Sequence, residues 1–161
     1  NSSGDKTNFE TLARYVDHLE KALLVHECSR YDIRGKEILA GARKFYVNDP
    51  AFREYLAPGF DPRLSRRLEN CIYLHFTAKG YKVHVGRSRN LEVDFVLEKG
   101  QERTYMQVCY MLSNEEVIDR EYRSLEAIPD NYPKVVVSMD DAEFGIRNGI
   151  RHQLAWEVLT A

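Results

Sequence analysis

Cysteine is scarce in this sequence, and the three cysteines that it has are Cys28, Cys71 and Cys109. They are odd in number, far apart and without a C-x-x-C pair, which argues against a disulfide framework or a zinc ribbon and favours a reducing compartment. No apolar run approaches the roughly 20 residues that span a membrane, and no signal peptide is recognisable. The chain begins at Asn1 rather than at an initiator Met. We therefore expect a fragment of a longer cytoplasmic protein.

Basic charge is also lacking overall, because the formal net charge is −2 at pH 7. This excludes a global positive field that would attract nucleic acid, so any site for a polyanion must be a local patch. The sequence contains no G-x-x-x-x-G-K-[ST] motif, so this chain cannot itself be an ATPase motor. Its five histidines show no paired spacing for zinc. At 161 residues, the chain is long enough for one sizeable core.

The first part of the chain predicts a helix followed by a β-hairpin. Apolar residues recur at helical spacing over about residues 8–26. Extended segments are predicted at residues 25–31, 37–39 and 44–47. A helix followed by a hairpin wing is the back half of a winged-helix module, so we expect residues 1–56 to form a partial winged-helix segment. Residues 57–62 are dense in Pro and Gly and are the expected linker.

After this linker the pattern becomes that of an α/β domain, expected over residues 57–161. An apolar stripe at helical spacing covers residues 64–76, and the helix is expected to end at Gly80. Ser113 opens a second helix, with Glu116 three residues later as a capping box. Strands are expected at residues 81–85, 91–97, 104–110 and, after the second helix, 135–137. The predicted order is helix, three strands, helix, strand.

Polar residues occur where this pattern predicts buried structure. Asp94 lies inside the apolar strand expected at residues 91–97. A charge there must be solvated, paired or bound to a metal, because burying a charge without a partner is costly. Upstream of it, Glu69 lies on the first helix of the α/β part. Downstream, Gln107 and Cys109 share one face of the next strand, because side chains alternate along a strand. Glu69, Asp94 and Gln107 are therefore the polar residues whose role in this pattern has to be explained.

A structural interpretation stays open for each of these residues. Glu69 can be a solvated or salt-bridged helix residue. Gln107 can be a hydrogen-bonded polar residue, and Cys109 a small buried one. Asp94 can cap a turn or pair with one of several arginines, for example Arg87, Arg89 or Arg120.

The predicted order of elements is that of the PD-(D/E)xK phosphodiesterase core, and a set of phrases extends along nearly the whole chain. These phrases are Tyr15-x-x-x-Leu19-Glu20-x-Ala22, Arg30-Tyr31-Asp32, Glu69-Asn70, Gly80-Tyr81-x-Val83-x-Val85-Gly86, Glu92-Val93-Asp94-Phe95-Val96, Tyr105-x-Gln107-Val108-Cys109-Tyr110, Arg120-Glu121-Tyr122, Asp130-Asn131-Tyr132-Pro133-Lys134 and Gly149-Ile150. In this ordered set the chain resembles the C-terminal domain of unknown function that follows the P-loop domain in many bacterial and archaeal ATPases of the AAA type. The resemblance implies a restriction-endonuclease-like core behind a partial winged helix.

The resemblance also implies a degenerate nuclease site. In active members of the broader superfamily, two acidic groups hold Mg²⁺, and a lysine two residues past the second positions the attacking water. The metal polarises the phosphate and lowers the pKa of water, and the lysine stabilises developing charge. Here Cys109 stands at the lysine position. We expect Glu69, Asp94 and Gln107 to form a slow or inactive site for Mg²⁺ or Mn²⁺, with ATP bound in the preceding ATPase domain.

Basic residues gather around the predicted hairpin, at Arg30, Arg34, Lys36, Arg43 and Lys44. In a winged helix this is where the DNA backbone would be contacted. The alternative is a solvated hairpin that packs against the ATPase domain or the nuclease-like core, since Asp32 and Glu37 dilute the positive charge.

From these features we expect a non-catalytic effector or recognition module at the C-terminus of a P-loop ATPase. It would couple the ATPase domain of the same chain to nucleic acid or to a protein partner. One alternative is a DNase that depends on Mg²⁺ or Mn²⁺, and another is a structural oligomerisation domain. A nuclease requires Glu69, Asp94 and Gln107 to converge on a metal. A DNA binder requires affinity that falls steeply with salt, and an assembly module requires an exposed apolar patch.

Overall fold

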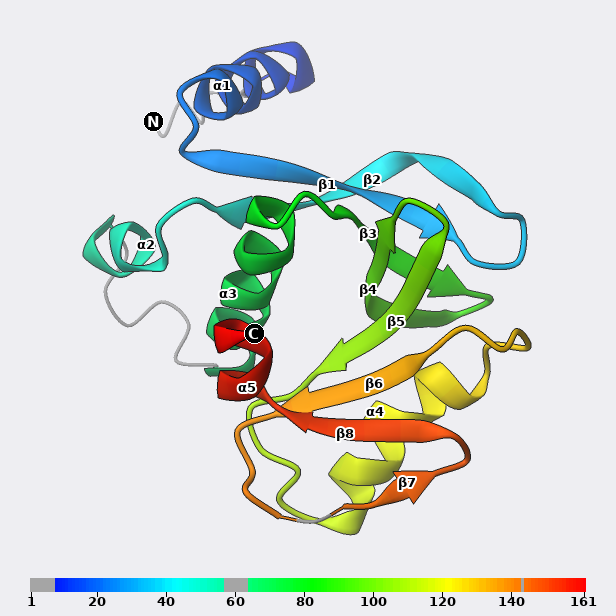
Figure 1. Cartoon of the computed structure of the whole chain (residues 1–161). Coiled ribbons are helices and arrows are strands. Elements are labelled where there is room, and N and C mark those ends of the chain that lie inside the picture. Colours follow the sequence, from blue (N-terminus) through cyan, green and yellow to red (C-terminus); the bar gives the residue numbers. More distant parts are fainter. Residues whose placement is uncertain (1–7, 57–63, 143) are drawn as a thin grey trace, which may run out of the picture.

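A computed structural model describes residues 8–56, 64–142 and 144–161, and the elements below are those of the described residues (Figure 1). The helices are α1 (Phe9–Lys21), α2 (Pro50–Leu56), α3 (Leu64–Ala78), α4 (Glu115–Glu126) and α5 (Ala155–Thr160). The strands are β1 (Val25–Asp32), β2 (Glu37–Val47), β3 (Lys82–Ser88), β4 (Leu91–Lys99), β5 (Glu102–Val108), β6 (Lys134–Ser138), β7 (Ile146–Arg147) and β8 (Ile150–Leu154). In these ranges no helix is long and apolar enough to cross a membrane.

The described strands form one mixed sheet of eight strands, in the order β2-β1-β3-β4-β5-β6-β8-β7. The pairs β1–β2, β3–β4, β4–β5 and β7–β8 are antiparallel. The pairs β1–β3, β5–β6 and β6–β8 are parallel. A parallel pair needs a crossover connection, which α4 supplies between β5 and β6. The prediction of an α/β chain is therefore confirmed.

Helices cover both faces of this sheet (Figure 1). On one face, Leu68 and Ile72 of α3 and Ala155 of α5 belong to one buried apolar cluster. On the other face, Tyr122 and Leu125 of α4 belong to a second cluster. Successive residues of β6 divide between the two clusters, as the alternation of side chains along a strand requires. The chain thus folds as helix, sheet, helix layers, with α3 and α5 on one side and α4 on the other.

The predicted order of helix, three strands, helix and strand is confirmed as α3, β3, β4, β5, α4 and β6. Gly80 follows α3 with φ +79°, a left-handed conformation that favours glycine and ends the helix as expected. The prediction that Ser113 caps α4 is wrong. Asn114 is the N-cap, and its side-chain oxygen accepts the backbone N–H of Val117 at 3.0 Å. The helix begins one residue later than expected, which shifts Glu116 out of the capping-box position.

The predicted hairpin is confirmed as β1 and β2, and it belongs to the main sheet because β1 pairs in parallel with β3. Its own pairing is irregular: Cys28 lies opposite Lys44 and Arg30 opposite Leu39, so that residues 40–43 pass the single residue Ser29. The expected linker at residues 57–62 lies outside the described residues. The division into segments 1–56 and 57–161 therefore stays a prediction.

Strand β4 carries a β-bulge at Asp94. The register of the β3–β4 pair shifts between His84 and Gly86, so that Asp94 and Phe95 together lie opposite Val85. A bulge bends its strand and redirects a side chain. Phe95 keeps a place in the cluster on the α3 side, and the carboxyl group of Asp94 reaches the backbone of the neighbouring strand β5.

Candidate functional site

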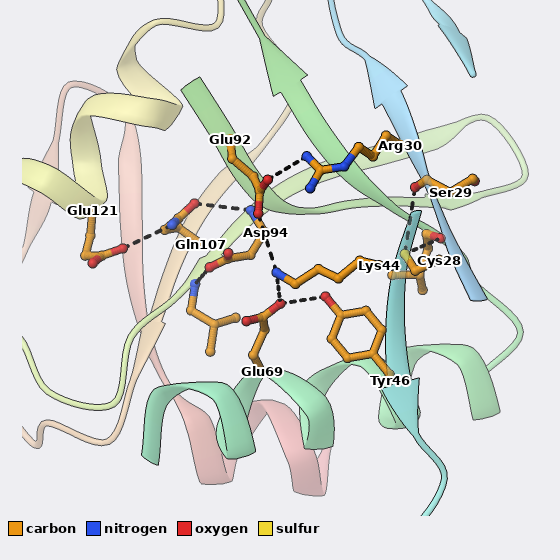
Figure 2. Close-up of polar contacts among 12 residues, drawn as sticks. Cys28, Ser29, Arg30, Lys44, Tyr46, Glu69, Glu92, Asp94, Gln107 and Glu121 are labelled. Atoms are coloured by element: carbon orange, nitrogen blue, oxygen red, sulfur yellow. Dashed lines mark hydrogen bonds and ion pairs between the residues drawn. The ribbon is translucent and has the colours of Figure 1, made fainter. Parts of the chain in front are cut away.

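The candidate site lies where α3 meets β2 and β4 (Figure 2). Lys44 Nζ is 2.6 Å from Glu69 Oε1, and the Tyr46 hydroxyl donates to the same oxygen at 2.5 Å. Lys44 and Tyr46 are two residues apart on β2, so their side chains project from one face of the strand. Burial, together with the charge of Glu69, raises the pKa of Tyr46. One buried carboxylate oxygen thus receives two donors from the hairpin.

The ammonium group of Lys44 is placed among several carboxylates. Its Nζ also lies 3.5 Å from Glu92 Oε1, and Glu92 Oε2 pairs with Arg30 at 2.6 Å. Burial by itself lowers the pKa of Lys44, but the negative charges around it, first of all Glu69, outweigh burial and raise the pKa. Lys44 is therefore a cation at neutral pH, held at the centre of an acidic cluster.

Asp94 completes the acidic part of the site. Its Oδ2 accepts the backbone N–H of Val108 at 2.8 Å. Burial raises the pKa of Asp94 to about 8, and the negative charges of Glu69 and Glu121 act in the same direction. The hydrogen bond from Val108 and the cation of Lys44 oppose them. The Asp94 carboxyl group therefore keeps its proton to a much higher pH than an ordinary aspartate.

Gln107 joins β4 to α4 through its side-chain amide. Its Oε1 accepts the backbone N–H of Asp94 at 3.3 Å and the Ser124 hydroxyl at 3.2 Å. Its Nε2 donates to Glu121 Oε2 at 3.0 Å. A carbonyl oxygen has two lone pairs, and both have partners inside the protein here. Gln107 is thus a hydrogen-bonded bridge, as the structural interpretation of this residue proposes.

Cys109, at the position where a lysine would be expected, faces α4. It is buried in the cluster that contains Tyr122 and Leu125, and its thiol donates to the Met111 carbonyl at 3.1 Å. Burial, with a contribution from the charge of Glu121, raises the pKa of the Cys109 thiol. Its neighbours are therefore those of the α4 layer and differ from the neighbours of Lys44.

The structure brings Asp94 into contact with Gln107 but divides the three predicted site residues between two hydrogen-bonded groups (Figure 2). Glu69 belongs with Lys44 on the α3 side, and Gln107 with Glu121 on the α4 side. In the described part of the chain, no three His, Cys, Asp or Glu side chains are grouped to hold a metal ion. As arranged, these donors do not fit Mg²⁺ or Mn²⁺, because Glu69 Oε1 is paired with the ammonium group of Lys44 and the Gln107 amide is hydrogen-bonded at both its oxygen and its nitrogen. Metal binding by Glu69, Asp94 and Gln107 stays a prediction from the sequence.

The cation that acts on Asp94 is Lys44, not one of the three arginines that the sequence suggests as its partners. Arg120 pairs with Glu121 at 2.6 Å, and Arg87 Nε donates to the Arg89 carbonyl at 3.0 Å. Within the described residues none of these three arginines forms an ion pair with Asp94. The positive charge comes instead from Lys44, which the hairpin brings in from the far side of β1 and β3.

Three of the five basic residues expected to contact DNA have acidic partners. These ion pairs are Arg30–Glu92, Arg43–Glu27 and Lys44–Glu69. The other two, Arg34 and Lys36, are exposed in the turn between β1 and β2. The basic residues of the hairpin without an ion pair among the described residues therefore lie at its turn, beside Asp32 and Glu37.

Tyr46 and Glu121 belong to the site but are absent from the sequence-based prediction. The signal for Tyr46 is its spacing from Lys44, which places a hydroxyl and an ammonium group on one strand face. The signal for Glu121 is its position on α4, three residues before the buried Ser124 and four before Leu125. An acid on the buried face of a helix needs a partner, and Gln107 and Arg120 supply it.

Comparison with known proteins gives one informative match. An uncharacterized protein of Haemophilus influenzae is 32% identical over 132 residues, which are 82% of this chain and 32% of that protein. The chain thus spans about a third of the length of the curated relative that it matches. No model of a protein family matches the chain, and no solved structure matches it.

Proposed function

We propose that this chain is a recognition module with a restriction-endonuclease-like fold that does not hydrolyse nucleic acid. In this proposal it forms the C-terminal part of a P-loop ATPase and couples that ATPase to nucleic acid. The observation that carries the absence of hydrolysis in this proposal is the contact between Lys44 and Glu69. A carboxylate that would hold the metal in an active nuclease is the partner of a protein cation in this chain.

The arrangement of elements supports the choice of fold class. Glu69 lies on the helix before the three strands, Asp94 on the second of those strands and Gln107 on the third. These are the positions that a PD-(D/E)xK layout assigns to its acidic residues. The ATPase context rests on the resemblance of the ordered phrases. The match to about a third of a longer relative is compatible with a module inside a larger protein.

The proposed absence of hydrolysis rests on how weakly Glu69 and Asp94 can bind a metal in this arrangement. Cleavage of a phosphodiester needs a metal that polarises the phosphate and activates water. A metal bound at Glu69 Oε1 would have to compete with Lys44 and the Tyr46 hydroxyl for that oxygen. Asp94 holds its proton more tightly than an ordinary aspartate, and a protonated carboxyl group is a poor ligand. Each of these features weakens a metal site.

The test is a titration of the chain with Mn²⁺, followed by NMR line broadening residue by residue, beside cleavage assays on plasmid, duplex and single-stranded DNA. We expect no localised broadening around Asp94 at millimolar Mn²⁺ and no cleavage. Asp94→Ala is the control, because it removes the carboxyl group that a bound metal would need. Localised broadening with cleavage, both lost in Asp94→Ala, would overturn the proposal.

The second candidate is a DNase dependent on Mg²⁺ or Mn²⁺, in which the same Lys44–Glu69 contact would have a catalytic role. Lys44 brings an ammonium group to within 2.6 Å of Glu69, and the sequence lacks that group at position 109. If Lys44 served as the catalytic lysine, metal-dependent cleavage would be present in the unmodified chain and lost in Lys44→Gln. The cleavage assays above, repeated with this variant, separate the two candidates.

A further inference from the structure

A second group of charged residues lies at the ends of two neighbouring hairpins, away from the Lys44–Glu69 contact. It surrounds a surface pocket of about 260 Å³ lined by Asp32, Arg34, Leu39, Arg87 and Arg89. Arg34 belongs to the turn between β1 and β2, and Arg89 to the turn between β3 and β4. Both turns lie on the same side of the molecule (Figure 1), as the register of β1 and β3 requires.

The backbone holds these residues in a fixed frame. Asp32 lies directly opposite Arg87 in the parallel pairing of β1 and β3, and the Ile33 N–H donates to the Arg87 carbonyl at 2.9 Å. Asp32 Oδ1 accepts the backbone N–H of Arg34 at 2.9 Å, which closes the first turn. The Arg87 guanidinium donates to the Arg89 carbonyl at 3.0 Å across the second turn. Hydrogen bonds within the two turns thus fix the backbone that carries these arginines.

The arginines of this pocket differ from the other basic residues of the hairpin in their partners. In the described part of the chain, Arg34, Arg87 and Arg89 form no ion pair, whereas Arg30 and Arg43 each have an acidic partner. The carboxylate of the pocket, Asp32, is already an acceptor for two backbone N–H groups of its own turn. The lining of the pocket therefore carries three positive charges, from the arginines, and one negative charge, from Asp32. Beside the pocket, the exposed Lys36 adds a positive charge, and Glu37, which lies opposite Asp32 in the β1–β2 pairing, adds a negative one.

We propose that this pocket binds a phosphate group of a nucleic-acid backbone. The planar fork of a guanidinium group matches the oxygens of a phosphate, and arginine is the residue best suited to this contact. Cations on two adjacent turns suit a linear polyanion that passes both of them better than they suit an isolated anion. The inference rests on the proposed function and assigns its nucleic-acid contact to Arg34, Arg87 and Arg89. Arg30, Arg43 and Lys44 are occupied with carboxylates.

The test compares two triple variants of equal charge by fluorescence anisotropy with a short labelled DNA duplex. The first carries Arg34→Ala, Arg87→Ala and Arg89→Ala. The second carries Arg14→Ala, Arg123→Ala and Arg151→Ala, which removes three exposed arginines from other elements. We expect the first to weaken binding by at least about tenfold and to reduce the salt dependence of the affinity. We expect the second to weaken binding less than about twofold, since it touches no phosphate contact.

A milder variant protects the test against loss of folding. Arg89 has φ +56°, a left-handed conformation in which glycine is unstrained. Arg89→Gly combined with Arg34→Ala therefore removes two guanidinium groups without straining the turn. Its control is Arg14→Ala with Arg123→Ala. A loss of DNA binding in the pocket variant alone supports the proposal.

Three outcomes would overturn it: equal losses in the pocket and control variants, no binding of the unmodified chain at low salt, or pocket-dependent binding to anionic phospholipid vesicles without binding to DNA. The Mn²⁺ and cleavage assays do not depend on this pocket. A failure of the phosphate site can therefore be told apart from a failure of the claim that the chain does not hydrolyse nucleic acid.

Discussion

Lys44 and Glu69 come from the edge strand of the sheet and from the helix that covers it, and their charged atoms meet at 2.6 Å. Their side chains are 29% and 11% exposed, so the contact is mostly shielded from water. Leaving either charge without its partner in such surroundings is unfavourable, since a buried charge needs compensation. The contact therefore ties the hairpin to α3, and its strength can be measured.

The first prediction is a coupling energy between these two residues. Lys44→Met and Glu69→Gln should each lower the free energy of unfolding by about 1–3 kcal/mol, and the double variant should lose less than the sum. Urea denaturation of the four proteins measures the coupling, which we expect at about 1–2 kcal/mol. The control is the exposed pair Lys21 and Asp17, whose coupling should be below about 1 kcal/mol. Similar couplings in both cycles would contradict the prediction.

The second prediction compares two buried tyrosines. The Tyr46 hydroxyl donates to Glu69, whereas the buried Tyr122 hydroxyl has no hydrogen-bond partner among the described residues. Tyr46→Phe should lower the free energy of unfolding by about 1.5–3 kcal/mol, because it removes a hydrogen bond to a charged group. Tyr122→Phe should be neutral or stabilising. Thermal and urea denaturation of both variants provide the measurement, and equal losses would refute this account of the site.

The third prediction concerns pH. Because the pKa of Asp94 is raised to about 8 in the folded chain, folding is favoured while this group is protonated. That contribution is complete below the pKa of the unfolded chain and is lost as pH rises through about 8. The stability of Asp94→Asn relative to the unmodified chain should therefore increase between about pH 4 and pH 8, by at most about 1.4 kcal/mol per pH unit.

Denaturation at a series of pH values measures this difference. Asp141→Asn, which removes an exposed carboxyl group, is the matched control for the change from Asp to Asn. Equal pH dependence in the two variants would contradict a raised pKa of Asp94.

The fourth prediction exchanges the two ends of a hydrogen bond. Gln107→Glu replaces the amide donor to Glu121 with a second carboxylate and should cost about 1–3 kcal/mol at neutral pH. Adding Glu121→Gln restores one donor and one acceptor across the same gap. The double variant should therefore recover most of the lost stability in urea denaturation. No recovery would mean that Gln107 is held by its bonds to Asp94 and Ser124 rather than by Glu121.

Much of the fold could be predicted because periodicity reports burial directly. The stripe on α3 reflects one buried face, and the apolar runs of β4 and β5 reflect strands that are buried on both faces. All three elements lie close to where the sequence places them. The C-terminal elements β7, β8 and α5 are short, and a two-residue strand carries no period. The order of strands in the sheet is also hidden from periodicity, since it depends on pairs far apart in sequence such as β1 with β3.

The candidate site could be predicted only in part for the same reason. Asp94 and Glu69 are visible because a charge in an apolar pattern needs an explanation. The role of Lys44 is not visible, because it depends on β2 bringing its side chain to α3. Its neighbours in the sequence, Arg43 and Phe45, give no indication that Lys44 points inward. A contact between distant segments is a property of the assembled sheet.

The irregular pairing of β2 affects whether separate molecules can aggregate through the edge of the sheet. β2 is an edge strand, and a long edge with free backbone groups invites strands from other chains to add to it. Where residues 40–43 pass Ser29, with Gly41 at φ +111°, the edge is broken into two short pieces. Neither piece offers an incoming strand a continuous row of partners. Straightening this segment by deletion would expose an uninterrupted template, and such a variant should precipitate at concentrations that the unmodified chain tolerates.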